Sequence, residues 1–278
     1  LSHELIHDYR LAPVTGDAMT YFPQAPYDYG CHGRIGVATP QANPTVEAEF
    51  SVLFPRTVSL QASRLVCPDP DPATRLRTYI RQLDEALESY GGMQLTAFDF
   101  ACTGSSYLVG AAEERQISGD LSDRFGYPVV TAAQAIRDVL NTLKARRIAL
   151  VSPYPEWLSD AARAYWTGSG FDVAQVLQVP TRTVNTETIY ELASSDAQPL
   201  LQDVDAEDVD LVLISGTGMP TLSAVRDAST SVPVVSSNMC LAWKLVQSAG
   251  LEQFLTPGQP PFISGWCDRL DEAARMPS

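Results

Sequence analysis

The chain has 278 residues, of which 45% are hydrophobic, and it carries 19 Lys and Arg against 33 Asp and Glu, a net charge of −14. This length suffices for one large or two ordinary globular domains with a well-buried core. The acidic balance argues against nucleic acid as a partner. No apolar stretch reaches the roughly 18 residues of a membrane span, and the first residues lack a secretion-signal pattern. We therefore expect a cytoplasmic globular protein that does not contact membranes.

The cysteines are odd in number and widely spaced, without a CxxC pair, and all three histidines precede residue 33. This pattern argues against a disulfide framework and against a zinc site. The cysteines are predicted to be reduced, either buried as small apolar side chains or held as reactive thiols. They are Cys31, Cys67, Cys102, Cys240 and Cys267.

In chain order, residues 1–32 show no clear periodicity and are predicted to form an N-terminal extension that would wrap a neighbouring subunit in a homo-oligomer. From Arg34 onward, short apolar runs alternate with amphipathic segments, which is typical of βαβ units and a parallel sheet. Strands are expected at 35–38, 57–60, 94–100, 128–130, 147–151, 172–176, 209–214 and 233–235. Helices are expected at 72–90, 132–144, 157–168, 186–193 and 241–249.

The two halves of this pattern repeat each other. The segment AFDFACTG at 97–104 matches LVLISGTG at 211–218, and each is followed by a Pro-Val-Val strand that opens a helix. The repeat predicts an α/β fold of two pseudo-symmetric Rossmann-like lobes with parallel sheets. The expected segments are a first lobe at 33–145, a second lobe at 146–240, and a C-terminal helix and tail at 241–278 that pack back on the first lobe.

Both matched turns stand at the carboxyl ends of predicted strands, where parallel sheets bind their ligands. A cleft between facing lobes would bring both turns onto one ligand. Cys102 precedes a run of small residues whose backbone N–H groups, at a helix start, would lower the thiol pKa and hold an anion. Thr217 and Gly218 form a second such turn, so carboxylate binding is predicted without any lysine or arginine. Taken singly, each turn also fits an ordinary strand-to-helix turn.

Six segments carry a resemblance to a known family: VATPQANPTVE at 37–47, ACTGSSY at 101–107, VSPY at 151–154, VNTE at 184–187, ISGTG at 214–218 and PVVSS at 233–237. With them the chain resembles the aspartate/glutamate racemase superfamily, and within it the maleate isomerase and arylmalonate decarboxylase branch. The resemblance spans about residues 33–250. It implies two pseudo-symmetric α/β lobes, no metal or organic cofactor, and a small carboxylic acid as substrate, with a dicarboxylic acid favoured.

The resemblance places Cys102 at the position of the first-lobe catalytic cysteine. Asn43, Tyr154 and Asn185 take positions that hold substrate carboxylates in the maleate isomerase branch. The alternative is structural: Tyr154 would cover a sheet edge, Asn43 would form an Asx turn and Asn185 would cap a helix. The two turns add further candidates for substrate binding, namely Thr103, Gly104, Ser105, Ser215, Gly216, Thr217 and Gly218.

The chain departs from the family pattern at Gly216, where the repeat would place a second-lobe cysteine. Racemisation by two bases needs a group on each face, so Cys102 alone suits it poorly. One thiolate suffices for cis-trans isomerisation by addition, rotation and elimination, and one proton donor suffices for decarboxylation. Cys240 is the rival for the missing thiol, but its spacing favours burial.

Maleate-type isomerisation is therefore the leading prediction. An arylmalonate-type decarboxylase is the second and a racemase the third. A protein that binds an anionic metabolite without turning it over is the non-enzymatic alternative.

Overall fold

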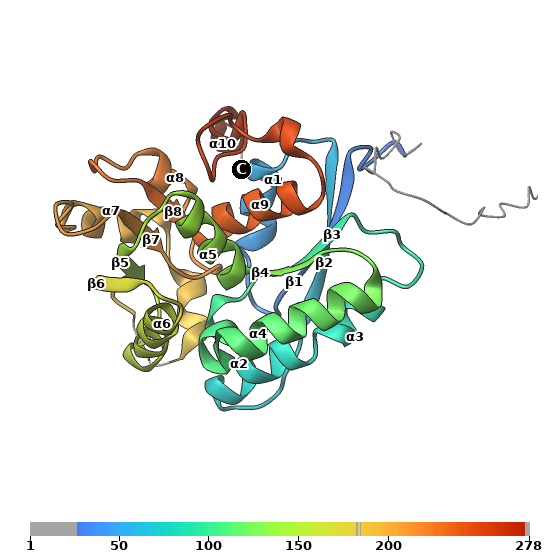
Figure 1. The fold of residues 1–278 in the computed structure, drawn as a ribbon, viewed down its shortest axis with the longest axis horizontal. Helices are drawn as coiled ribbons and strands as arrows, with labels where there is room; N and C mark the ends of the chain where they lie inside the picture. The colour runs from blue at the N-terminus through green and yellow to red at the C-terminus, as the bar shows by residue number, and fades with distance from the viewer. Residues whose placement is uncertain (1–26, 182, 184, 276–278) are drawn as a thin grey trace, which may run out of the picture.

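The computed structural model describes residues 27–181, 183 and 185–275, so most of the predicted N-terminal extension lies outside the described residues. The chain forms two four-stranded sheets with the orders β2-β1-β3-β4 and β6-β5-β7-β8, in which all named pairings are parallel (Figure 1). This confirms the predicted fold class. The strands are β1 (Gly33–Pro40), β2 (Val58–Leu65), β3 (Ala97–Phe100), β4 (Val129–Thr131), β5 (Arg147–Ser152), β6 (Asp172–Gln178), β7 (Leu211–Ile214) and β8 (Val234–Ser236).

Helices flank both sheets, with α2, α3 and α4 beside the first sheet and α6, α7 and α8 beside the second (Figure 1). The helices are α1 (Val46–Leu53), α2 (Pro72–Arg81), α3 (Leu83–Glu88), α4 (Thr103–Phe125), α5 (Ala132–Thr142), α6 (Glu156–Gly168), α7 (Ser194–Gln202), α8 (Leu222–Arg226), α9 (Ser237–Ser248) and α10 (Trp266–Arg275), with 3-10 helices η1 (Thr186–Glu191) and η2 (Glu252–Phe254).

The central strands explain why these segments fold as a parallel sheet. All four residues of β3 and of β7 are buried, and five of the six residues of β5 are. Strands covered by helices on both faces read as continuous apolar runs rather than as alternating ones. Asp99 is the exception within β3, because its carboxyl is fully buried and finds no hydrogen-bond partner among the described residues.

The backbone hydrogen bonds show that the two sheets are equivalent. The Ala101 N–H donates to the Ala38 carbonyl at 2.9 Å, and the Ser215 N–H donates to the Val151 carbonyl at 2.9 Å. Ala101 follows β3 and bonds to β1, and Ser215 follows β7 and bonds to β5 in the same way. The residues that come next, Cys102 and Gly216, are therefore also equivalent. The repeat predicted from the sequence therefore places these two positions correctly.

Three predicted helices differ from the observed ones. The segment 72–90 is broken at Gln82, whose φ of −107° and ψ of 22° separate α2 from α3. The last predicted helix begins at Ser237 instead of Leu241, because the Ser236 hydroxyl caps it by accepting from the Met239 N–H. The segment predicted at 186–193 is a 3-10 helix that ends at Glu191.

The chain crosses back after the second sheet. Helix α9 follows β8 but contacts α5, α1, β3 and β4, and it lies between the two sheets in Figure 1. Helix α10 contacts α1 and α8. The two sheets thus share helical packing, which fixes how their carboxyl ends face each other. The segment boundaries at 145 and 240 stay predictions.

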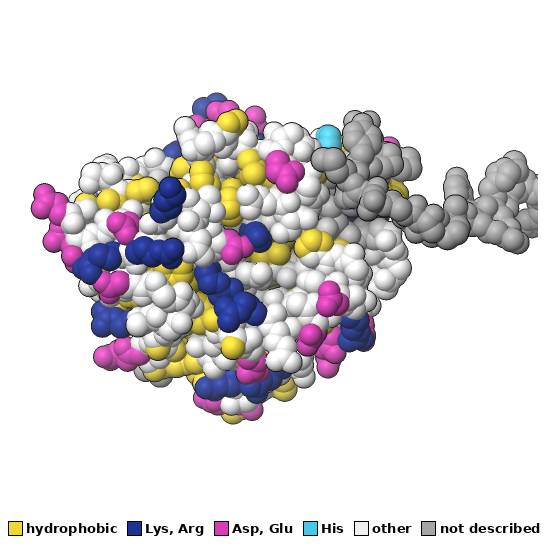
Figure 2. All heavy atoms as spheres, in the orientation of Figure 1, with side chains coloured by type: hydrophobic (Ala, Val, Ile, Leu, Met, Phe, Trp, Pro, Cys, Tyr) yellow, Lys and Arg dark blue, Asp and Glu magenta, His cyan; other side chains and the backbone are white. Residues whose placement is uncertain are grey.

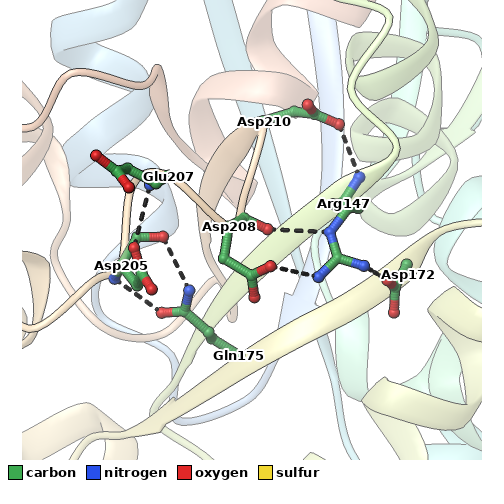
Figure 3. A network of polar contacts seen from close by, with 7 residues as sticks. All are labelled: Arg147, Asp172, Gln175, Asp205, Glu207, Asp208 and Asp210. Atoms are coloured by element: carbon green, nitrogen blue, oxygen red, sulfur yellow. Dashed lines mark hydrogen bonds and ion pairs between the residues drawn. The ribbon is translucent and has the colours of Figure 1, made fainter.

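An exposed polar network marks the opposite end of the second sheet (Figure 3). The Arg147 side chain donates to the Asp208 carbonyl at 3.0 Å and carboxylate at 2.6 Å, and it also pairs with Asp172. The Asp210 carboxylate accepts the Arg146 and Arg147 N–H groups, and these bonds lower its pKa. Because β5 begins at Arg147 and β6 begins at Asp172, the network connects the amino ends of these strands. It lies away from the carboxyl ends, which carry the site.

The molecular face in Figure 2 shows acidic and basic side chains interspersed. Within the part of the chain that the structure describes, no helix is long and apolar enough to cross a membrane.

Candidate active site

A small cavity of about 30 Å³ lies at the carboxyl ends of the strands and is lined from both halves of the chain. The lining comprises Pro40, Gln41, Ala42, Asn43, Arg75, Leu76, Tyr79, Cys102, Tyr154, Thr186, Glu187, Ile189, Tyr190 and Thr217. Four predicted site residues are among them: Asn43, Cys102, Tyr154 and Thr217.

Cys102 is the N-cap residue of α4, two residues after the end of β3, and its side chain is buried. The Ser105 hydroxyl donates to Sγ at 3.3 Å. Burial raises the pKa of the thiol, while hydrogen bonds from the Ser105 hydroxyl and from the N–H groups of Ser105 and Gly104 lower it in part. The prediction of a lowered pKa is wrong, because removal from water outweighs the helix-start donors. In this buried position the thiol is protonated at neutral pH.

No thiol faces Cys102 at the equivalent position. Gly216 has a φ of +90°, which favours glycine. A Cβ placed there would lie 3.0 Å from Cγ of Pro153 and 3.3 Å from the Tyr154 hydroxyl. The space that a second thiol would need is therefore bounded by Tyr154.

Cys240, the sequence-level rival, is fully buried in α9 and is not among the lining residues. Burial raises the pKa of its thiol. This position agrees with the expectation that Cys240 is a buried cysteine.

Tyr154 joins the two halves of the cavity. Its hydroxyl shares a hydrogen bond of 2.7 Å with Oγ1 of Thr103, the residue after Cys102. Burial, and then the charge of a Cys102 thiolate, raise the pKa of Tyr154 well above its ordinary value. The Tyr154 hydroxyl therefore stays protonated at neutral pH.

Two further tyrosines, Tyr79 and Tyr190, line the cavity and are not predicted as site residues from the sequence. Burial is the largest cause that raises the pKa of each, to about 12 for Tyr79, and a Cys102 thiolate is the second cause. With Tyr154, three neutral phenols therefore line the cavity beside Cys102. Tyr79 follows a helical pattern that equally suits a core residue, which is why its position in the sequence gives no signal.

Asn43 and Thr217 bridge the two halves on another side. Asn43 Oδ1 accepts the N–H of Thr45 at 2.9 Å, as in an Asx turn, and Nδ2 approaches the Thr217 carbonyl at 3.3 Å. Thr217 Oγ1 donates to the Ala101 carbonyl at 2.8 Å. Asn43 thus satisfies its structural interpretation and lines the cavity as well.

Arg75, in the first turns of α2, brings a positive charge to the cavity with a side chain only 12% exposed. Its Nη2 donates to Asn185 Oδ1 at 3.3 Å and lies 3.5 Å from Glu187 Oε1. The two turns are expected to bind a carboxylate without lysine or arginine, and the structure adds Arg75 to the lining of their cavity. Three arginines lie in the expected helix at 72–90, and nothing in the sequence tells which one faces the site.

Asn185 is not among the lining residues. Its side chain caps η1 by accepting the Glu187 N–H at 3.2 Å and contacts Arg75. Asn185 therefore caps a helix, as the structural alternative predicts. Any effect of Asn185 on a substrate would act through its hydrogen bond with Arg75.

The remaining predicted residues surround the cavity without lining it: Thr103, Gly104, Ser105, Ser215, Gly216 and Gly218. Ser215 shares a 2.8 Å hydrogen bond with the Tyr107 hydroxyl. A Cβ on Gly218 would lie 2.5 Å from the Tyr190 ring and 2.8 Å from Ile189, so η1 packs closely on this turn. Among the described residues, no group of three or more His, Cys, Asp or Glu could hold a metal ion.

Comparison with known proteins agrees with this arrangement. A maleate isomerase from Pseudomonas putida is 24% identical over 249 residues, covering 84% of this chain and 97% of the relative. The arylmalonate decarboxylase of Bordetella bronchiseptica is 28% identical over 235 residues, covering 81% and 93%.

A solved structure shares the fold. It is a cysteine-to-serine variant of the Nocardia farcinica maleate cis-trans isomerase with a covalently bound succinylcysteine intermediate. It has a TM-score of 0.69 at 22% identity, over 79% of this chain and 93% of that one. The family model described as arylmalonate decarboxylase matches residues 35–259. The chain therefore belongs to the arylmalonate decarboxylase family.

Proposed function

We propose that this protein is a cofactor-independent cis-trans isomerase of a small unsaturated carboxylic acid of the maleate type, with Cys102 as its nucleophile. The observation that carries the proposal is the position of Cys102 at the start of α4, facing a cavity lined from both sheets. The succinylcysteine intermediate of the Nocardia farcinica relative supports the same chemistry. A cytoplasmic location and a homo-oligomeric state stay predictions from the sequence.

The reaction would begin when the Cys102 thiolate adds to one carbon of the double bond. The sulfur–carbon bond forms, and the π electrons move toward the carboxylate on the other carbon. The remaining carbon–carbon bond is single and rotates. Elimination then reforms the double bond in the trans geometry and releases the thiolate, so atoms and charge balance without a cofactor.

The burial of Cys102 shapes how the thiolate would form. Because burial raises the pKa of the thiol, the N–H groups of Gly104 and Ser105 and the Ser105 hydroxyl would stabilise the ion only in part. A cavity opened to water would lower the cost of burial and so favour the thiolate.

The proton-handling group on the side of Gly216 would be Tyr154. Its hydroxyl bounds the space of the missing thiol and is held by Thr103 at 2.7 Å. A neutral phenol would donate a proton to the carbanionic carbon of the adduct, and the resulting phenolate would take a proton back before elimination. Asn43 and Thr217 would orient one substrate carboxylate.

A decarboxylase is the second candidate, because a cavity with one thiol also fits a reaction that needs one proton donor. A carbanion left by loss of CO₂ from a substituted malonate would take its proton from Cys102. The family model and the Bordetella bronchiseptica relative support this alternative.

The test is a proton NMR assay with maleate and phenylmalonate as separate substrates. We expect fumarate from maleate, a loss of at least about 10³ in kcat for Cys102→Ser, and most activity retained in Cys240→Ser. Product from phenylmalonate alone would favour the decarboxylase. Turnover of neither acid, or loss of activity with Cys240→Ser only, would contradict the proposal.

A further inference from the structure

We propose that Arg75 binds a second carboxylate of the substrate, which replaces the Glu187 carboxylate beside it, so that the pair selects dicarboxylic acids. The inference rests on the proposed function for the position of the reacting carbon, but its test measures binding alone.

The Arg75 guanidinium is held on one side by neutral groups. Nη1 donates to the backbone carbonyls of Asp69 at 3.1 Å and Pro70 at 3.4 Å, and Nη2 donates to Asn185 at 3.3 Å. The side chain is 12% exposed. An arginine stays charged in proteins, and a desolvated cation requires a close anion.

Glu187 supplies that anion only loosely. Its Oε1 lies 3.5 Å from Nη2 of Arg75, beyond the usual length of a charge-assisted hydrogen bond. The Glu187 side chain is 45% exposed, so it can exchange the contact for water at small cost. A substrate carboxylate that approaches the guanidinium more closely would therefore replace it.

The cavity connects this ion pair to the reacting thiol. Arg75 and Glu187 line it together with Cys102, and so do Tyr79 and Tyr190. The two phenols therefore share one cavity with the thiol and with the guanidinium. An acid whose double bond lies at Cys102 would direct one carboxylate toward Arg75 and the other toward Asn43 and Thr217, because all four residues line this cavity.

The same helix offers a matched control. Arg81 also lies in α2 and pairs with a glutamate, since its Nε lies 2.9 Å from Oε1 of Glu113. This pair is exposed and is not part of the cavity lining. Arg81→Gln and Glu113→Gln therefore make the same chemical changes away from the site.

The experiment is calorimetric titration of the full chain carrying Cys102→Ala, which prevents turnover, with maleate and with its monoamide. We expect maleate to bind at least about tenfold more tightly than the monoamide. Arg75→Gln should abolish this ratio and leave monoamide binding within about threefold. Arg75→Lys, which keeps the charge without the fork, should give an intermediate ratio. Glu187→Gln should tighten maleate binding about threefold or more and leave the monoamide unchanged.

Equal weakening of both ligands by Arg75→Gln would overturn the inference, because it would show that Arg75 only maintains the fold of the site. Weaker maleate binding in Glu187→Gln, or a changed ratio in the control variants, would overturn it as well. Absence of fumarate from the unmutated protein, with the binding ratio intact, would refute the isomerase proposal and leave the role of Arg75 standing.

Discussion

Restoring a second thiol by Gly216→Cys looks simple from the repeat, yet the structure predicts that it damages the protein. Two costs arise at Gly216. Its φ of +90° is a conformation that L residues rarely adopt, and the new Cβ would lie 3.0 Å from Pro153 and 3.3 Å from the Tyr154 hydroxyl. The backbone strain costs about 1–3 kcal/mol, and overpacking adds about 1–3 kcal/mol.

Gly170→Ala separates these two costs. Gly170 has the same φ of +90°, but a Cβ there would meet nothing within 4 Å. Gly170→Ala should therefore show the backbone cost alone, and Gly216→Ala should exceed it by about 1–3 kcal/mol. For a chain of this size each kcal/mol lowers Tm by about 2–4 °C, so Gly216→Ala should lose at least about 4 °C.

The assay is thermal and urea unfolding of the three variants beside the unmutated protein, followed by turnover of maleate. We expect Gly216→Cys to lose stability like Gly216→Ala and to lose turnover, because Tyr154 must move. The reasoning is refuted if Gly216→Ala costs no more than Gly170→Ala, or if Gly216→Cys is as stable as the unmutated protein and racemises a chiral acid.

Three further predictions concern single groups. Tyr154→Phe removes the second-lobe donor, so kcat should fall by about 10²–10⁴-fold; steady-state kinetics with an unchanged Tm would show that the loss is chemical. Burial raises the pKa of Asp99 well above its ordinary value, so folding is most favourable below the ordinary pKa and weakens as pH rises toward the folded pKa. Asp99→Leu, which copies the equivalent Leu213, should raise the unfolding free energy by about 1–3 kcal/mol at pH 8; equal urea stability of both proteins at pH 8 would contradict this. Burial also raises the pKa of Cys102, so its alkylation by iodoacetamide should still be accelerating above pH 9, and a rate that levels off below pH 8 would contradict it.

The sequence allows prediction of the sheet architecture because the strands are continuous apolar runs and because the chain repeats itself. Equivalence of Cys102 and Gly216 follows from that repeat, and the backbone bonds at Ala101 and Ser215 confirm it. Asn43, Tyr154 and Thr217 are predictable for a related reason. Each stands just after a strand, so the topology alone brings them to one edge.

The other residues of the site lie on α2 and η1, and the order of the strands does not determine where these two helices place their side chains. Arg75 and Tyr79 project from α2, and their orientation depends on how that helix packs. Tyr190 reaches the cavity through a 3-10 helix whose closeness to Gly218 is a tertiary contact. The raised pKa of Cys102 is not predictable from the sequence for a similar reason, since its burial is set by side chains distant in the sequence.

The most direct test of the account is mass spectrometry of the protein mixed with maleate, quenched in acid during turnover and digested. The account predicts that the peptide containing Cys102 gains the mass of one maleate, and that Cys102→Ser neither forms this adduct nor produces fumarate. Fumarate production at an undiminished rate by Cys102→Ser, or an adduct on a different residue while Cys102 stays unmodified, would contradict it.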